Sequence, residues 1–218
     1  MLVIKEYNRL HALEYARRWA LDRNPLFFDF KGYGGDCTNF ISQCIYAGCC
    51  EMNYTPIFGW YYRTPDDRSA AWTGVEYFNN FITSNEGIGP FGREVTEDEV
   101  ELADVIQLAD DTGDFYHTLI VTGIKNGGIF VSAHTNDVYN RKLSSYRYAF
   151  ARYLHIDGIR ADTEENRDRN CFFRLIGGIP NSTERELGTY VPGSNVPGTN
   201  VPGNNASDNN SFIENEML

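Results

Sequence analysis

Apolar residues in the first half of the chain recur at intervals of three and four positions, the spacing of amphipathic helices. The pattern predicts three helices: one over residues 7–23, one over 37–48 and one that starts at Thr73. The first ends before Pro25, which disfavours helical conformation in the residue ahead of it, and the second ends at Gly48. Thr73 and Glu76 have the spacing of a capping box, which marks the start of the third.

The second half of the chain consists of short runs of β-branched and aromatic residues separated by polar turns. These runs predict strands over 104–108, 117–122, 129–134 and 151–156. Asn126-Gly127 lies between the second and third strands and is a preferred sequence for a two-residue type I′ hairpin turn. Helices that precede an antiparallel meander predict an α+β fold, with N-terminal helices packed on a small antiparallel sheet.

The C-terminal part of the chain has a different composition. Residues 191–205 repeat a Val-Pro-Gly pentapeptide three times, and such repeats bury little apolar surface. Residues 161–218 hold 9 of the 30 acidic residues but 4 of the 19 basic ones. We therefore expect a folded domain over 1–158, an acidic and partly ordered extension over 159–190, and a flexible tail over 191–218.

The composition also narrows the class of partner. Hydrophobic residues make up 42% and aromatic residues 14% of the 218 residues, which is enough for a sizeable core. The net charge of −11 disfavours nucleic acid as a partner, because proteins bind its phosphates through clustered Lys and Arg. No apolar run approaches the ~18 residues of a membrane span. The first residues do not form a signal peptide, so we expect a chain that is cytoplasmic as made.

The five cysteines, at positions 37, 44, 49, 50 and 171, are odd in number and lack paired C-x2-C units. We therefore expect neither a disulfide framework nor a structural zinc site, and a chain suited to a reducing compartment. The acidic run 110–114 lacks the spacing of an EF-hand calcium loop. The sequence thus predicts no metal and no cofactor.

One cysteine lies in a setting that suits catalysis. Cys37 follows Gly34-Gly35-Asp36 at the start of the second predicted helix. The dipole and free N–H groups at a helix N-terminus favour a thiolate, and the same N–H groups can stabilise an oxyanion. A lone cysteine on an apolar helical stripe is more often a core residue, and this is what we expect of Cys44. The catalytic interpretation of Cys37 therefore needs a base nearby.

The predicted hairpin supplies a base. If the hairpin has a two-residue turn, its register places His134 and Asn136 on the face of the sheet that carries His117, with Asn136 directly opposite. A three-residue loop would instead put Asp137 opposite His117. The predicted catalytic residues are therefore Cys37 as nucleophile, His117 as base, and one of His134, Asn136 and Asp137 to orient the base.

The same residues give the chain a resemblance to a known family. The motif Gly34-Gly35-Asp36-Cys37-Thr38-Asn39-Phe40 resembles the amidase domain family of Firmicutes, a distant relative of NlpC-type and CHAP cell-wall peptidases in the papain-like superfamily. The resemblance runs in order from about residue 5 to 156. It continues through these segments: Tyr7-Asn8-Arg9, Arg23-Asn24-Pro25, Trp60-Tyr61-Tyr62, Asp104 to Gln107, His117 to Thr122 and Ser132 to Asp137.

The resemblance implies a papain-like cysteine hydrolase fold with Cys37 as nucleophile and His117 as base, and it favours His134 as the third residue. It implies cleavage of an amide bond through a thioester, in a peptide or in peptidoglycan, without metal or cofactor. Asp36 and the helix start would support the oxyanion. Since the chain has no signal peptide, we expect action on a cell wall to follow release of the protein.

Two other functions remain open. One is a catalytically silent module that uses the cleft to bind wall peptides or a protein, and the other is a thiol acyltransferase that uses Cys37 and His117 with an amine in place of water. The segment between nucleophile and base is rich in aromatic residues, among them Trp60, Tyr61 and Trp72. Core packing is one interpretation of these three. The other is a wall of the substrate cleft.

Overall fold

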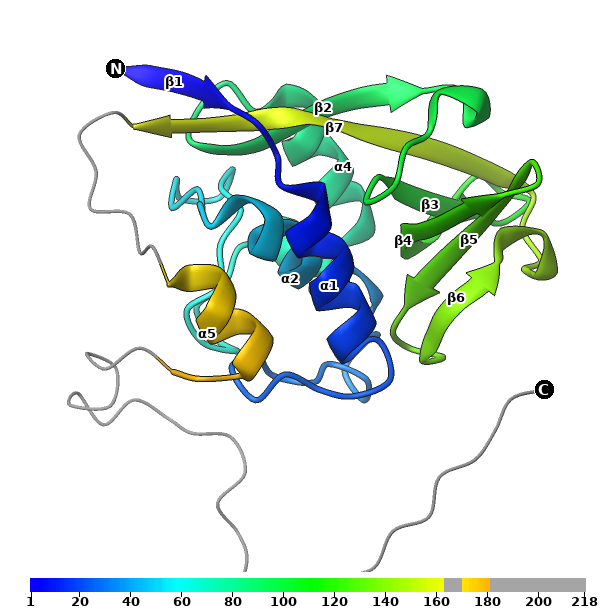
Figure 1. The fold of residues 1–218 in the computed structure, drawn as a ribbon, viewed down its shortest axis with the longest axis horizontal. Helices are drawn as coiled ribbons and strands as arrows, with labels where there is room; N and C mark the ends of the chain where they lie inside the picture. Colours follow the sequence, from blue (N-terminus) through cyan, green and yellow to red (C-terminus); the bar gives the residue numbers. More distant parts are fainter. Residues whose placement is uncertain (163–169, 181–218) are drawn as a thin grey trace, which may run out of the picture.

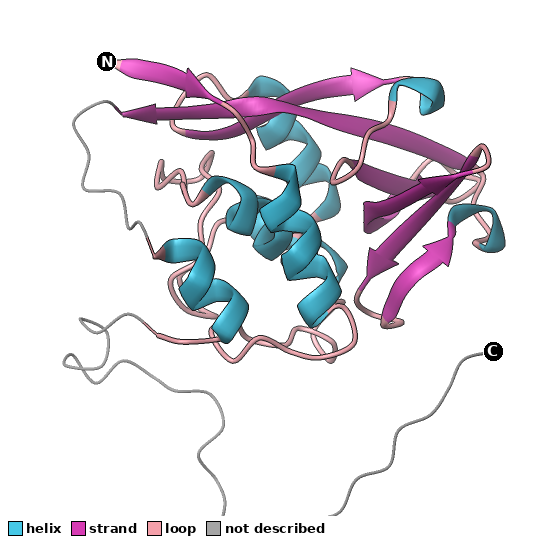
Figure 2. Cartoon of the chain, viewed as in Figure 1, coloured by secondary structure: helices cyan, strands magenta, loops and turns pink. Residues whose placement is uncertain are grey.

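An antiparallel sheet of seven strands is the framework of the fold in the computed structural model, which describes residues 1–162 and 170–180 (Figures 1 and 2). The strand order is β1-β7-β3-β4-β5-β6, and β2 also pairs with β7. The strands are β1 (Leu2–Lys5), β2 (Gly89–Val95), β3 (Val105–Ala109), β4 (Phe115–Lys125), β5 (Gly128–Ala133), β6 (Val138–Lys142) and β7 (Phe150–Asp162).

The helices lie together beside this sheet (Figure 1). They are α1 (Arg9–Trp19), α2 (Cys37–Cys49), α3 (Ala70–Thr73), α4 (Val75–Ser84) and α5 (Cys171–Gly177). The predicted α+β class and the antiparallel sheet with packed N-terminal helices are confirmed.

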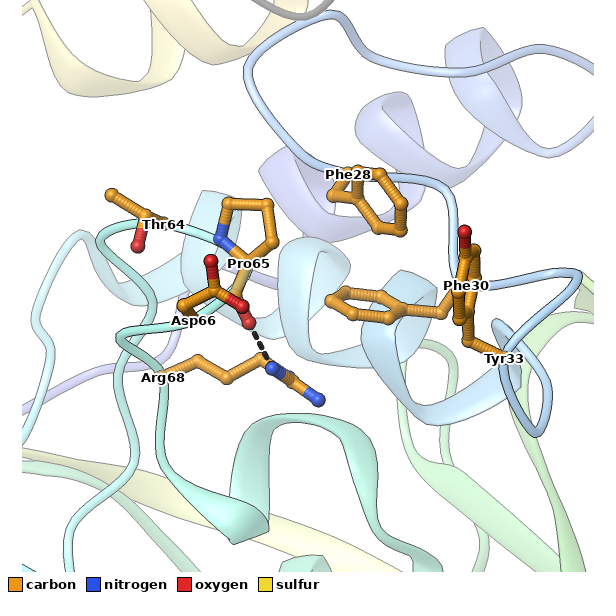
Figure 3. Close-up of a pocket in the computed structure, with 7 residues that line it drawn as sticks. All are labelled: Phe28, Phe30, Tyr33, Thr64, Pro65, Asp66 and Arg68. Atoms are coloured by element: carbon orange, nitrogen blue, oxygen red, sulfur yellow. Dashed lines mark hydrogen bonds between the residues drawn. The ribbon is translucent and has the colours of Figure 1, made fainter. Parts of the chain in front are cut away.

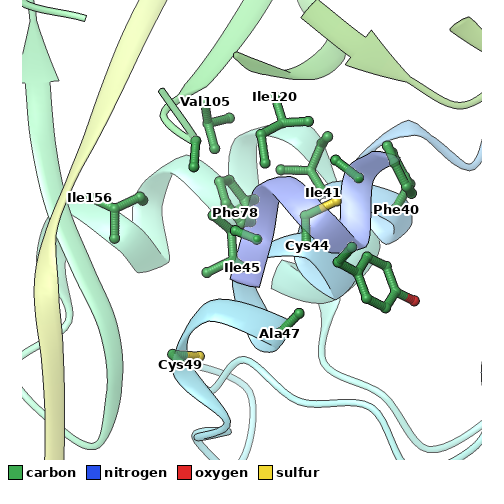
Figure 4. Packing of buried hydrophobic residues seen from close by; sticks show 14 of the residues in the cluster. Phe40, Ile41, Cys44, Ile45, Ala47, Cys49, Phe78, Val105, Ile120 and Ile156 are labelled. Carbon is green, nitrogen blue, oxygen red and sulfur yellow. The ribbon is translucent and has the colours of Figure 1, made fainter. Parts of the chain in front are cut away.

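Helix α2 lies at the centre of the core because its sequence contains no charged residue and every residue except Tyr46 is buried. Figure 4 shows its apolar side chains packed against the sheet and α4, with Phe40, Ile41, Cys44 and Ile45 beside Phe78, Val105, Ile120 and Ile156. Cys44 is fully buried, as predicted. Burial of each large side chain of this kind contributes about 1.5–3 kcal/mol to stability.

The hairpin of β4 and β5 has the predicted two-residue turn. Lys125 pairs with Gly128, and Asn126 and Gly127 both have positive φ angles, as a type I′ turn requires. A β-bulge lies between Val121 and Gly123, however, and it shifts the register of the rest of the hairpin by one residue.

Two local predictions about the helices are wrong. The first helix covers Arg9–Trp19 and is shorter than 7–23, because the Asn8 side chain caps it by accepting a hydrogen bond from the His11 N–H. Thr73 ends α3 and does not cap α4, whose N-cap is Gly74. The Glu76 carboxylate pairs instead with Arg152 of β7, 2.9 Å away.

Three strands were not predicted because their sequences lack the alternation of a half-buried strand. β2 contains Gly and Pro, β6 is mostly polar, and β1 is four residues long. All three gain their conformation by pairing with longer strands, β1 and β2 with β7 and β6 with β5.

The described C-terminal residues extend the folded core. β7 runs past residue 158 to Asp162, and α5 packs Phe172 and Leu175 into the same apolar cluster as α1 and α2. Cys171 forms a disulfide with Cys50 at the end of α2, across 121 residues of sequence. The cysteine pattern predicts no disulfide framework and did not indicate this single bridge, because chain folding brings together two cysteines whose spacing gave no signal. The Val-Pro-Gly tail over 191–218 lies outside the described residues, so the domain division stays a prediction.

Three cysteines, Cys37, Cys44 and Cys49, lie outside the disulfide. We expect thiol titration of the denatured, unreduced protein to find three thiols, and reduction to raise the number to five. Cys171→Ala with Cys50→Ala should lower the free energy of unfolding by about 2–5 kcal/mol, because the bridge closes a long loop in the unfolded chain. Urea unfolding of oxidised and reduced protein measures this cost. Five thiols before reduction would contradict the disulfide.

Candidate active site

The site is built around the start of α2, where Asp36 is the N-cap residue. Gly34 and Gly35 precede it with φ angles of 98° and 114°, a conformation that glycine adopts without strain. The Asp36 backbone N–H donates to Thr135 Oγ1 at 3.0 Å. This contact fixes the helix start against the turn that follows β5.

The Asp36 carboxylate is fully buried and does not cap its own helix. Its Oδ1 accepts hydrogen bonds from the Phe30 N–H at 3.0 Å and from Asn39 Nδ2 at 2.7 Å. Its Oδ2 lies 2.6 Å from His134 Nδ1 and 3.5 Å from Arg23 Nε. A buried carboxylate needs such partners, because an uncompensated charge in the interior costs several kcal/mol, or about 3–5 kcal/mol when one partner is removed.

His134 has a polar partner on each ring nitrogen. Nδ1 faces the Asp36 carboxylate, and Nε2 lies 2.9 Å from the Trp19 carbonyl oxygen. Both partners are oxygen atoms that can accept a hydrogen bond, so each ring nitrogen has a polar contact. The ring also stacks on Phe40, with centroids 3.9 Å apart. His134 therefore has no ring nitrogen free to contact His117.

Arg23 extends this network to the surface. Its Nε lies 3.1 Å from Asp29 Oδ2, and its Nη2 donates to Asp137 Oδ1 at 2.9 Å. Partial burial alone would raise the pKa of Asp137, but the hydrogen bond and charge of Arg23 outweigh it and lower that pKa below its ordinary value. Asp137 is thus a partner of Arg23, whereas Asn136 is exposed in the turn.

Cys37 is 7% exposed and is the first residue of α2. Its Sγ lies 3.8 Å from Thr38 Oγ1, which in turn hydrogen bonds Thr118 Oγ1 at 2.8 Å. Gln107 Nε2 also donates to Thr118 Oγ1, at 3.3 Å. These bonds join the start of the helix to the start of β4, where His117 lies.

His117 is partly buried and pairs across the sheet with Leu108. Its ring neighbours are Tyr116 and Tyr146, with centroids 6.3 and 6.1 Å away. Burial lowers its pKa from 6.5 to about 4, so the ring is neutral near neutral pH. Among the described residues, no hydrogen bond joins His117 to Cys37 or to a polar residue that would orient its ring.

The bulge in β4 explains why His117 and His134 do not meet. Thr118 faces α2, and the neighbouring Leu119 packs in an apolar cluster on the other face of the sheet. Val121 pairs with Val131, one residue out of the register at the turn. A slip of one residue moves each side chain to the opposite face, so His134 lies on the α2 side. The predicted shared face of His117, His134 and Asn136 is therefore wrong.

The aromatic residues proposed for the cleft lie elsewhere. Trp60 and Trp72 are fully buried in the core, where Trp60 Nε1 donates to Ser42 Oγ and Trp72 Nε1 donates to Asn39 Oδ1. The structure thus shows core packing for both. Tyr61 is half-buried beside Tyr54, with ring centroids 5.3 Å apart.

Sequence reasoning missed the residues that hold this site together, namely Arg23, Thr38, Asn39 and Thr118. All four lie in the motifs quoted above, but each acts through a partner that is distant in sequence. In the described parts of the chain, no group of three or more His, Cys, Asp or Glu side chains could hold a metal ion. None of the helices within 1–162 and 170–180 is a candidate membrane span.

The fold and site define an α+β protein with a buried cysteine, Cys37, at a helix N-terminus. The start of this helix contacts β4, which carries His117 near its beginning. Residues 6–156 match the family described as "Putative amidase domain", and the chain belongs to that family. No solved structure matches the chain.

Two relatives are uncharacterized proteins of Bacillus subtilis (strain 168). YhbB is 33% identical over 159 aligned positions, and the alignment covers 66% of this chain and 50% of that protein. YjcM is 30% identical over 145 aligned positions, and the alignment covers 63% of this chain and 33% of that protein. The chain therefore spans half the length or less of these two curated relatives.

We expect Asp36→Asn to lower the free energy of unfolding by about 3–5 kcal/mol, because it leaves the buried His134 without its charged partner. His134→Gln should cost a similar amount, and the double variant less than the sum of the two. Asp137→Asn is the control and should cost at most about 1 kcal/mol, since its ion pair is partly exposed. Urea unfolding followed by tryptophan fluorescence gives all four values. Additive costs would show that the two residues do not interact.

Proposed function

We propose that the protein is a cysteine hydrolase that cleaves an amide bond through a thioester. The hydrogen bond between Thr38 and Thr118 is the observation that carries this proposal. Cys37 and His117 immediately precede these two residues in sequence, so the bond holds the backbone at the candidate nucleophile close to the backbone at the candidate base. The His117 side chain itself lies on the other face of the sheet. Membership of an amidase family supports amide hydrolysis in general.

In the proposed reaction His117 takes the proton from Cys37 Sγ, and the sulfur attacks the amide carbonyl carbon. The carbon–nitrogen bond then breaks, His117 protonates the leaving amine, and a thioester remains on Cys37. His117 next removes a proton from water, which attacks the thioester and releases the acid. Sulfur regains its proton, and the enzyme returns to its starting state.

His117 suits the role of base because its lowered pKa keeps the ring neutral and able to accept a proton. In the resting structure its ring does not contact Cys37. Catalytic hydrogen bonds are often absent or long before substrate binds. We propose that substrate binding brings the two side chains together. Because His117 lies on the face of the sheet away from α2, this requires a local change of the backbone at the start of β4 and not rotation of the side chain alone.

Asp36 and His134 are proposed to position the nucleophile and not to exchange protons with substrate. Their contacts fix the residue directly before Cys37, and through Asn39 they also fix the first turn of α2. The N–H groups in the first turn of a helix lack partners within the helix. We propose that the backbone N–H groups of Cys37 and its neighbours stabilise the oxyanion. Asp36, which was expected to support it, has a buried carboxylate and is not assigned this role.

The substrate class we propose is a peptide, or a peptide of peptidoglycan, on the strength of the family resemblance. A catalytically silent binding module is the second candidate, because the resting structure has no contact between Cys37 and His117. A thiol acyltransferase would use the same two residues, with an amine in place of water.

We expect Cys37→Ala and His117→Ala each to reduce hydrolysis of a peptide or peptidoglycan substrate at least ~10³-fold, since either change removes a reacting group. Mass spectrometry of the products, with and without an added amine, distinguishes hydrolysis from acyl transfer. Cys49→Ala is the control, because this thiol is also buried and outside the disulfide but lies at the far end of α2. Equal activity in all three variants would exclude the proposed chemistry, and a wild-type protein that binds but never cleaves would indicate the silent module.

The pKa of His117 predicts the acid limb of the pH profile. The ring must be neutral to accept a proton, so kcat/KM should rise with pH to a plateau with a midpoint at about 4. An exposed histidine would give a midpoint at about 6.5. Initial rates between pH 3 and 8, with fluorescence as a check on folding, test this. A kcat/KM midpoint near 6.5 would show that His117 is not buried in the free enzyme.

A further inference from the structure

A pocket of about 650 Å³ opens between two loops that flank α2 (Figure 3). This volume falls within the range of small-molecule sites. One wall carries aromatic rings, and the other carries polar and charged groups. The lining residues are Phe28, Phe30, Tyr33, Thr64, Pro65, Asp66 and Arg68.

Asn39 ties both walls of the pocket to the first turn of α2. Its Nδ2 donates to the Phe28 carbonyl oxygen at 3.0 Å, which holds the aromatic wall. Its Oδ1 accepts a hydrogen bond from Trp72 Nε1 at 2.8 Å. Trp72 lies four residues after Arg68, on the chain segment that forms the charged wall. The Phe30 N–H is bonded to Asp36, which precedes Cys37. The pocket is therefore anchored to residues on both sides of the candidate nucleophile.

Arg68 gives the pocket a positive charge that the described residues do not neutralise. Its guanidinium lies over the Phe30 ring, 4.4 Å from the centroid (Figure 3). Nη1 donates to the Pro65 carbonyl oxygen and Nε to Thr73 Oγ1. Nη2 has no partner in the described part of the chain. The side chain is thus held in place by neutral acceptors and retains donors for an anion.

We propose that this pocket is a substrate subsite that binds a carboxylate next to an apolar or aromatic group. Phe28 and Phe30 would pack against the apolar group, and Arg68 Nη2 would donate to the carboxylate. Asp66, on the rim, would repel a second negative charge, so the ligand carries a single carboxylate. The role of the pocket as a substrate subsite rests on the proposed amide hydrolysis. Its preference for a carboxylate ligand can be tested without any reaction.

The binding test uses 3-phenylpropionate and its neutral counterpart 3-phenylpropan-1-ol, neither of which contains an amide bond. NMR titration of the full chain, followed at the Phe30 and Arg68 amide signals, gives the two dissociation constants. We expect the carboxylate to bind at least about tenfold more tightly, because it makes a charge-assisted hydrogen bond that the alcohol does not. Equal binding of the two compounds, or shifts at other residues only, would overturn the proposal.

Matched variants assign the preference to Arg68. Arg68→Gln should remove the difference in affinity between the two compounds. Arg63→Gln is the matched control and should retain it. This substitution removes the same charge, but Arg63 lies outside the pocket and pairs with Asp67. Asp66→Asn should strengthen carboxylate binding. Loss of the preference in Arg63→Gln, or its survival in Arg68→Gln, would contradict the assignment.

Activity assays then separate this proposal from the proposed function. Peptide amides that carry a carboxylate at the C-terminus or on a side chain are each compared with the matched carboxamide. Faster hydrolysis of one of the two carboxylates than of its carboxamide supports the subsite, provided that Arg68→Gln removes this preference mainly through a higher KM. The preferred peptide then shows whether the carboxylate comes from the C-terminus or from a side chain. Hydrolysis without such a preference contradicts the subsite and leaves amide hydrolysis standing. Binding of 3-phenylpropionate without hydrolysis of any amide contradicts the enzyme and leaves the pocket standing.

Discussion

The rest of the site depends on the buried carboxylate of Asp36. A charge without access to water must be compensated by donors, and here they come from the loop before α2, from α2 itself and from the turn after β5. His134 adds the end of α1 through its bond to the Trp19 carbonyl. The carboxylate thus connects the loop before α2, α2 itself and the distant turn after β5 directly, and the end of α1 through His134. Cys37 is the residue that directly follows Asp36.

The sheet imposes a second constraint, since its register decides which side chains meet the helix. The bulge in β4 turns Thr118 and His134 toward α2 and leaves His117 among tyrosines on the other face. The same strand therefore supplies a structural contact to the helix start and, one residue earlier, a candidate base with a lowered pKa. The low polarity that depresses this pKa is a consequence of the face on which His117 lies.

The proposed chemistry and the proposed recognition have a common anchor in the first turn of α2. Asn39 bonds the Asp36 carboxylate. It also bonds Phe28 in the aromatic wall of the pocket and Trp72, which lies four residues after Arg68. An amide side chain with two donors and one acceptor oxygen can connect three segments in this way. The position of the pocket relative to Cys37 is therefore set by the interactions that set the position of Cys37 itself.

The sequence by itself determined the α+β class, the buried face of α2, the hairpin turn at Asn126-Gly127 and Cys37 as the residue at the start of a helix. Each of these follows from local periodicity or turn chemistry, which the chain expresses within a few residues. Only the tertiary structure decided the bulge that separates His117 from His134, and the disulfide between Cys50 and Cys171. Both depend on which distant segments pack together, and no local pattern encodes that choice. The strands β1, β2 and β6 were missed for the same reason, because partner strands impose their extended conformation.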